Sequence, residues 1–219
     1  MLLLLRLIIS VLERVLLIDA SILIRDVSES LKLLLRTNIE ELSGENEITL
    51  NSPADIELAP NQSGLSLFLY TIQENPHMKN TQLAQIHPDT SQYPPLALDL
   101  YYLLTPYSSS TNSSRQVEQI ILTKVMSTFH DNSILDSFML TDNLVESGNK
   151  ELRVVLNALS LEQLNQMWGM FRNSSYRLCI SYVITPLQIP SVRTEAARRV
   201  ISRQIDKYLK KDGNRMDQQ

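Results

Sequence analysis

The stretch from residue 93 to residue 107 constrains the fold of this 219-residue chain more than any other. Pro94 and Pro95 open it, and apolar side chains then occupy both faces at the period of two that a β-strand imposes. One face carries Leu96, Leu98, Leu100, Tyr102 and Leu104, and the other carries Ala97, Asp99, Tyr101 and Leu103. A strand of this kind belongs inside a sheet that is covered on both sides. Because proline donates no hydrogen bond to a ladder, pairing is expected to begin after Pro95.

Alternation of the same kind predicts further strands at residues 47–50, 56–58, 65–74, 151–157 and 176–184. We expect the second strong strand, 65–74, to lie centrally in the sheet, and Pro186 and Pro190 to end the last strand.

Helical spacing predicts helices within residues 26–35 and 115–129, and a third helix after the capping box of Ser160 and Gln163. Residues 75–92 and the polar run 108–114 show no apolar periodicity and are predicted to be connections. These patterns predict an α/β (α+β) protein with a single mixed, mainly antiparallel β-sheet flanked by helices.

Residues 1–25 are rich in Leu and Ile, but charged residues interrupt them every few positions. No apolar run approaches the roughly 20 residues that a bilayer-spanning helix needs, and no basic segment or cleavage site marks a signal peptide. We interpret residues 1–25 as an amphipathic helical extension that packs on its own domain or on a neighbouring subunit. Interfacial membrane binding, or an extension that results from translation at an upstream start, are the alternative interpretations.

The C-terminal segment 191–219 is predicted to be a basic helix, over residues 192–211, and a tail. That helix contains seven basic residues and two acidic ones, Glu195 and Asp206, which gives a local charge of +5 in a chain of net charge −4. We predict that Arg199, Arg203, Lys207 and Lys210 are subunit-interface residues that meet acidic surfaces. A solvated basic face is the alternative. The net charge gives no reason to expect nucleic acid as a partner.

The sequence offers little catalytic chemistry. His77, His87 and His130 lack the spacing by which a helix presents two metal ligands, and no glycine-rich phosphate loop is present. Asp99 is the most unusual acid, but a lone carboxyl group in an apolar strand is more often a hydrogen-bonded structural residue than a catalyst. We expect a protein that is no enzyme and uses no cofactor. The lone Cys179 allows no intrachain disulfide and suits a reducing, intracellular compartment.

Three segments, taken in their order and spacing, resemble one protein family: residues 67–75, residues 93–107, and residues 159–168 followed by 176–189. Together they resemble the cap, or tail-terminator, family of extracellular contractile injection systems. These systems are phage-tail-like particles of the virulence-cassette and antifeeding-prophage type.

The resemblance implies a tail-terminator-like α/β domain over residues 26–190 that assembles as a homo-hexameric ring. It further implies that the ring closes the distal end of the inner tube, contacts the last sheath layer and ends their polymerisation, as a cytoplasmic protein within an assembled particle. The competing function belongs to another class. It is a membrane-associated adaptor that uses residues 1–24 as an interfacial helix.

Overall fold

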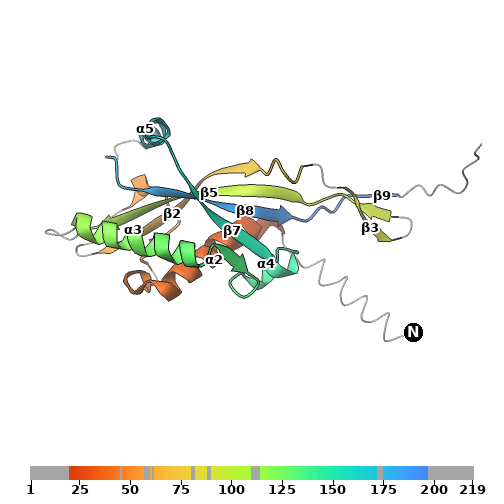
Figure 1. Ribbon diagram of the computed structural model, residues 1–219, viewed down its shortest axis with the longest axis horizontal. Coiled ribbons are helices and arrows are strands. Elements are labelled where there is room, and N and C mark those ends of the chain that lie inside the picture. The colour runs from red at the N-terminus through yellow and green to blue at the C-terminus, as the bar shows by residue number, and fades with distance from the viewer. Residues whose placement is uncertain are drawn as a thin grey trace, which may run out of the picture.

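The computed structural model describes residues 20–44, 46–56, 60, 62–79, 82–87, 90–109, 114–171 and 175–196. A six-stranded sheet with helices on both faces forms an elongated body, and a three-stranded sheet projects from one end of it (Figure 1). The helices are η1 (Ala20–Ile22), α2 (Leu23–Asn38), η2 (Glu40–Leu42), η3 (Pro53–Asp55), α3 (Ser114–Asp131), α4 (Asp142–Glu146) and α5 (Leu161–Met170). The strands are β1 (Ile48–Thr49), β2 (Ser63–Glu74), β3 (Ala84–His87), β4 (Thr90–Gln92), β5 (Leu96–Ser108), β6 (Ile134–Asp136), β7 (Glu151–Asn157), β8 (Ile180–Ile189) and β9 (Thr194–Ala196).

The body sheet has the strand order β1-β2-β5-β8-β7-β6. Only β1 and β2 pair in parallel, and every other neighbouring pair is antiparallel. The prediction of a mixed, mainly antiparallel sheet flanked by helices is therefore confirmed for the body. The small second sheet was not predicted.

Strand β5 is a central strand, between β2 and β8, and it begins directly after Pro94 and Pro95. Leu100, Leu103 and Leu104 are fully buried, and they point to opposite faces of the sheet. The prediction of a two-sided core strand is thus confirmed. Strand β2 was expected to lie centrally, but it is second in the strand order. Since its outer neighbour β1 has only two residues, most of β2 lies at the edge of the sheet.

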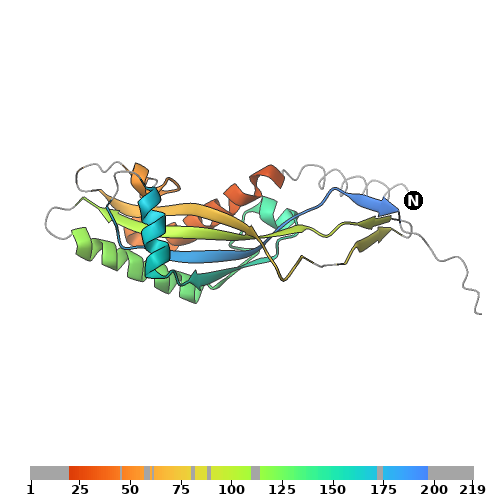
Figure 2. The same cartoon turned by 90° about the horizontal axis from the view of Figure 1, so that it is seen from above.

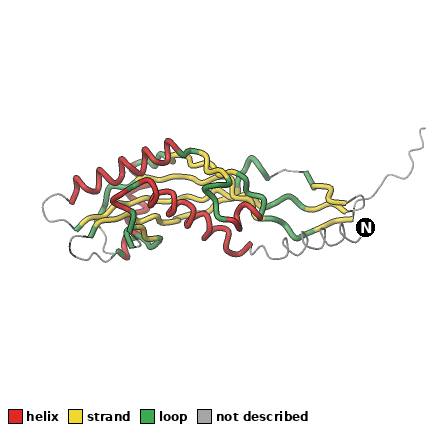
Figure 3. The backbone as a smooth tube through the Cα atoms, turned by 90° about the horizontal axis from the view of Figure 1, so that it is seen from below, coloured by secondary structure: helices red, strands yellow, loops and turns green. Residues whose placement is uncertain are grey.

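Helices α2 and α3 lie along one face of the body sheet, as seen from below in Figure 3. The predicted stripe of α2 is buried there, with Val27, Leu31 and Leu35 at 0% exposure. These residues join Ile121 and Val125 of α3 and the inward side chains of the strands in the larger hydrophobic core. Burial of this one face explains why both helices are amphipathic.

Helix α5 crosses the opposite face of the sheet (Figure 2). The predicted capping box is present: the Ser160 hydroxyl accepts a hydrogen bond from the Gln163 backbone N–H, and the Gln163 side chain accepts one from the Ser160 backbone N–H. Trp168 packs with Leu103 and Cys179 in a second, smaller core, whereas Leu161 is 79% exposed and does not contribute. The helix covers only part of this face.

The last body strand runs from Ile180 to Ile189. The expected bounds 176–184 are therefore wrong, because the strand passes through Pro186, but it does end directly before Pro190 as expected. Pro186 lies inside β8, next to Thr185, where the register against β5 shifts between Leu98 and Leu100. This bulge removes Pro186 from the ladder on one side. On the other side the pairing of β7 with β8 already ends at Thr185, so the missing N–H of Pro186 leaves no partner unpaired.

The projecting sheet, which we call the arm, has the strand order β3-β4-β9 and is antiparallel throughout. Two of its strands come from residues 75–92, which were predicted to be a connection only. The third, β9, occupies Thr194–Ala196, so the predicted terminal helix does not begin at residue 192. The rest of that predicted helix lies outside the described residues.

Candidate assembly surfaces

Three segments connect the arm to the body: one leads from β2 into β3, and the other two lie side by side and form what we call the neck. Of the two neck segments, one leads from β4 into β5 and contains Tyr93, and the other leads from β8 into β9 and contains Arg193. The Tyr93 backbone N–H donates to the Arg193 carbonyl at 3.0 Å, and the Arg193 guanidinium lies 4.1 Å from the centre of the Tyr93 ring. The Tyr93 hydroxyl also donates to Glu195 at 3.1 Å. These contacts continue the strand pairing of the body into the arm.

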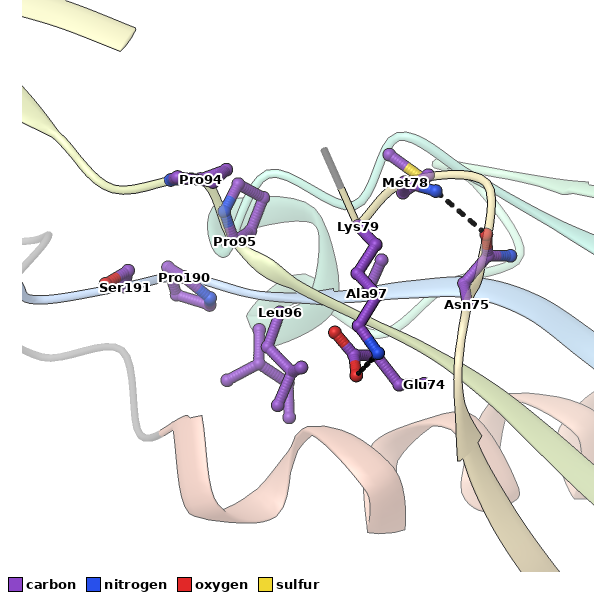
Figure 4. Close-up of a pocket in the computed structure, with 11 residues that line it drawn as sticks. Glu74, Asn75, Met78, Lys79, Pro94, Pro95, Leu96, Ala97, Pro190 and Ser191 are labelled. Carbon is purple, nitrogen blue, oxygen red and sulfur yellow. Dashed lines mark hydrogen bonds and ion pairs between the residues drawn. The ribbon is translucent and has the colours of Figure 1, made fainter. Parts of the chain in front are cut away.

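A hollow of about 300 Å³ lies where the neck meets the body (Figure 4). Prolines from both neck segments line it, Pro94 and Pro95 on one side and Pro190 on the other. An ion pair of 2.8 Å between Lys79 and Glu74 closes its rim. The hollow is small and open, and it carries no constellation of groups that could act on a substrate.

Asp99 lies near this hollow, since its hydrogen-bond partner Asn75 is one of the residues that line it. Its carboxylate accepts hydrogen bonds from the Asn75 side-chain amide at 2.8 Å and from the Thr185 hydroxyl. Asn75 is 8% exposed, and its side-chain oxygen Oδ1 accepts hydrogen bonds from the backbone N–H groups of His77 and Met78 at 2.9 Å and 3.2 Å. The cluster fixes the turn after β2 onto the bulge of β8, which supports a structural interpretation of Asp99.

A larger, mainly apolar pocket of about 650 Å³ lies between α5 and the part of the sheet that α5 leaves bare. Its apolar wall comes from Phe68, Tyr70 and Tyr101 of the strands and from Met167, Met170 and Phe171 of α5 and its end. The Phe68 and Phe171 rings meet edge to face at 6.1 Å. Uncharged amides of Asn157, Gln163 and Gln166 form the rim. Such a lining suits an uncharged protein surface better than a small charged ligand.

The four basic residues predicted to form the subunit interface, Arg199, Arg203, Lys207 and Lys210, lie outside the described residues. The structure does place the other residues that the sequence singled out. Cys179 is 9% exposed in the smaller core, and burial raises the pKa of its thiol. His77 follows β2, His87 ends β3 and His130 lies in the last turn of α3.

Within the described ranges, no group of three or more His, Cys, Asp or Glu residues could hold a metal ion. None of the described helices is long and apolar enough to cross a membrane. The segment that the adaptor hypothesis uses, residues 1–24, is described only from residue 20 onward.

A sheet of this topology, with helices on both faces, is found in proteins that terminate the tubes of contractile injection particles. The PVC sheath/tube terminator of an extracellular contractile injection system, in its extended state, has this fold with a TM-score of 0.57. It is 16% identical, and the match covers 85% of this chain and 64% of that chain. The anti-feeding prophage cap, a tube terminating cap, matches with a TM-score of 0.53 and 18% identity over 83% of this chain and 60% of that chain.

The model of the Pvc16 N-terminal domain family matches residues 26–203, and the chain belongs to this family. The resemblance inferred from the three sequence segments is thereby confirmed. No curated protein matches the chain. The chain spans less than two thirds of the length of either terminator structure.

Proposed function

We propose that this protein is a structural cap that closes the distal end of the inner tube and sheath of a contractile injection particle and ends their polymerisation. The observation that carries the proposal is the shared fold with two terminators over more than four fifths of the chain. The proposed partners are the tube and sheath subunits and further copies of the chain. In this proposal the copies form a homo-hexameric ring, and the particle is assembled in the cytoplasm.

The architecture suits such a role. A terminator needs a rigid scaffold and two complementary surfaces that close a ring in place of an open filament. Strands β5 and β8 run through the body and lead directly into the neck, so the arm and the body can present different surfaces at a fixed distance. In this role Arg199, Arg203, Lys207 and Lys210 are proposed to contact acidic neighbouring surfaces, and no catalytic step is assigned to the chain.

Particles produced without this protein test the proposal directly. We expect them to vary in length and to lack an ordered distal end in electron micrographs, and supplying the wild-type chain should restore a single length. Particles of normal length with an ordinary end would rule the role out.

A second variant tests the basic residues separately. Replacing Arg199, Arg203, Lys207 and Lys210 together by Gln removes four charges without adding bulk. We expect weaker incorporation into particles, and stronger suppression of incorporation by salt in the wild type than in the variant. Equal incorporation at every salt concentration would remove these residues from the proposed interface and leave the cap function standing.

A further inference from the structure

The outer edge of β2 is covered over only a small part of its length. Strand β1 pairs with Leu65 and Ser66 and with no later residue of β2. The edge from Leu67 to Glu74 therefore has no strand beside it in the described part of the chain. An uncovered strand edge presents a row of backbone groups that another strand can pair with.

Backbone geometry tells which groups point outward. The Leu65 N–H donates to the Glu47 carbonyl on the β1 side, away from β5. Because alternate residues of a strand direct their backbone groups to the same side, the N–H and C=O groups of Leu67 and Leu69 also point away from β5. Tyr70 is the extra residue of the bulge against β5. Beyond this bulge the residues whose backbone groups point outward are therefore the even-numbered ones, Ile72 and Glu74. The Asn75 N–H agrees with this phase, because it points inward to Ala97. Four residues thus present their N–H and C=O groups outward, and no described residue hydrogen-bonds to them.

Apart from the bulge at Tyr70 and the charge of Glu74 at its end, this edge lacks the features by which proteins discourage strand addition. Residues 67–73 contain no charge and no proline, and Ile72 is 43% exposed. The apolar pocket beside α5 opens along the same strand, through Phe68 and Tyr70. An added strand would gain backbone hydrogen bonds from the edge and side-chain contacts from the pocket, which is the usual basis of recognition by strand addition.

The arm offers a donor strand on the same chain. Strand β3 is one of the two edge strands of the arm and pairs only with β4 among the described strands. Its sequence, Ala-Gln-Ile-His, is uncharged, so it would place no like charges opposite residues 67–73. None of the arm residues whose side chains the structure describes belongs to either hydrophobic core, and a small sheet with little core of its own gains stability when another surface covers it.

We propose that strand β3 in the arm of one copy adds to the β2 edge, Leu67–Glu74, of a second copy. The proposal rests on the proposed ring and names its contact. The two surfaces differ, so the contact is head-to-tail and passes from copy to copy, as a closed ring requires.

Amide hydrogen exchange on the wild-type chain tests the contact at the backbone. In dilute, monomeric protein the outward N–H groups of Leu67, Leu69, Ile72 and Glu74 should exchange fast. In the assembled state the two of them that pair with β3 should slow by at least about tenfold, since a four-residue edge strand turns two of its carbonyl groups outward. Assembly without added protection at these four amides overturns the proposal while leaving the proposed function intact.

Two variants test the head-to-tail geometry. Ile72→Pro removes one outward N–H and no bond to β5, and Ile72→Val, which keeps that N–H, is its matched control. Replacing Ala84–His87 by Gly-Ser-Gly-Ser removes the donor strand instead. Each variant alone should stay monomeric in sedimentation velocity, with self-association weakened at least about tenfold, and Ile72→Val should assemble as the wild type does.

Mixing the two variants gives the decisive result. The Ile72→Pro chain keeps a working arm and the arm variant keeps a working edge, so a mixture should form dimers and nothing larger. Dimers of the arm variant alone would show an edge-to-edge contact and overturn the proposal, as would a mixture that stays monomeric. If Ile72→Pro fails to fold by circular dichroism, the exchange experiment still decides.

Discussion

At the scale of single residues, Asp99 shows how position alone misleads. An acid in an apolar strand invites a catalytic interpretation, because burial can raise the pKa of a carboxyl group. The structure instead surrounds this carboxylate with donors from Asn75 and Thr185. Neither partner is within 20 residues of Asp99 in sequence. The sequence could therefore predict a polar partner but could not identify it.

The cluster makes a graded prediction for substitutions of Asp99. Asp99→Asn keeps an oxygen that can accept from both Asn75 and Thr185, so the free energy of unfolding should fall by less than about 1 kcal/mol. Asp99→Leu leaves the Thr185 hydroxyl without its acceptor and leaves the Asn75 amide with the Thr185 hydroxyl oxygen alone, at 3.1 Å, and should lower it by about 2 kcal/mol or more. Urea denaturation of the three proteins checks the order. A larger loss for Asn than for Leu would contradict the structural role.

Tyr102 makes a pH-dependent contribution to stability. Burial raises the pKa of its hydroxyl to about 12, although a hydrogen bond of 2.7 Å with the Ser28 hydroxyl lowers it somewhat. The unfolded chain releases this proton near pH 10, the ordinary pKa of tyrosine. The contribution is therefore fully present below pH 10 and is lost as the pH rises towards 12.

A shift of this size corresponds to about 3 kcal/mol over the whole titration, of which about 2 kcal/mol is lost between pH 10 and pH 12. We expect the wild-type chain to lose about that much more stability between pH 10 and pH 12 than Tyr102→Phe, measured by urea denaturation at each pH. Comparison with the Phe variant is needed because burial also raises the pKa of Tyr107 and Tyr182. Parallel curves for the two proteins would contradict the assignment.

At the scale of elements, sequence pattern predicted those that bury a regular apolar face. Strand β7 has the predicted bounds, β5 begins where its prolines allow, and α5 begins at its predicted capping box. The predicted end of β8 at residue 184 is wrong because Pro186 does not end the strand. Whether a bulge absorbs Pro186 depends on the partner strand, and the sequence of β8 does not contain that information.

A side chain also completes β8 where no strand does. Beyond Thr185, Asn149 takes the place of a neighbouring strand: its amide donates to the Gln188 carbonyl at 2.9 Å and its carbonyl accepts from the Gln188 N–H at 2.7 Å. Asn149 is 3% exposed. Pairing by a side chain so far away in sequence has no periodic signature, so sequence analysis could not have found it.

The surroundings of two glycines predict opposite effects on stability when each is replaced by alanine. In β2, a Cβ atom on Gly64 would lie 2.2 Å from the Glu47 carbonyl oxygen and 2.5 Å from the Tyr107 hydroxyl. Gly64→Ala must therefore displace β1 or Tyr107, and we expect a loss of about 2 kcal/mol or more. In α5, a Cβ atom on Gly169 meets nothing within 4 Å. Gly169→Ala should stabilise the protein by about 0.5–1 kcal/mol, because alanine is the better helix former.

Thermal denaturation of the two alanine variants checks both signs at once. The Gly169 variant serves as the control for the effect of an added methyl group. An unchanged melting temperature for Gly64→Ala would mean that β1 can move away from β2 at no cost.

At the scale of the whole molecule, the body and the arm differ in what holds them together. The body has two cores, and no described side chain of the arm contributes to either. Replacing Ala84–His87 by Gly-Ser-Gly-Ser should therefore change the free energy of unfolding of the body by less than about 0.5 kcal/mol. Thermal denaturation followed by the fluorescence of Trp168, in the smaller core, measures the body alone. A clear drop in its melting temperature would mean that the arm supports the body.

The same difference explains why the arm was missed. Its strands have three or four residues each, and only the four residues of β3 alternate between apolar and polar side chains, too short a run to distinguish residues 75–92 from a connection. The body could be predicted because its strands share a core. The basic surface predicted near the C-terminus stays a prediction, since its residues are not among those described.

The continuity of β5 and β8 through the neck has a mechanical consequence. A pull on the arm along the long axis loads β5 and β8, the two innermost strands of the body, in the same direction, so the ladders that join them to β2 and β7 are loaded lengthwise (Figure 1). Under that direction of force the bonds of each ladder must yield together, because they are sheared; a crosswise pull would open them one by one. The molecule is thus strongest along the axis on which its arm projects.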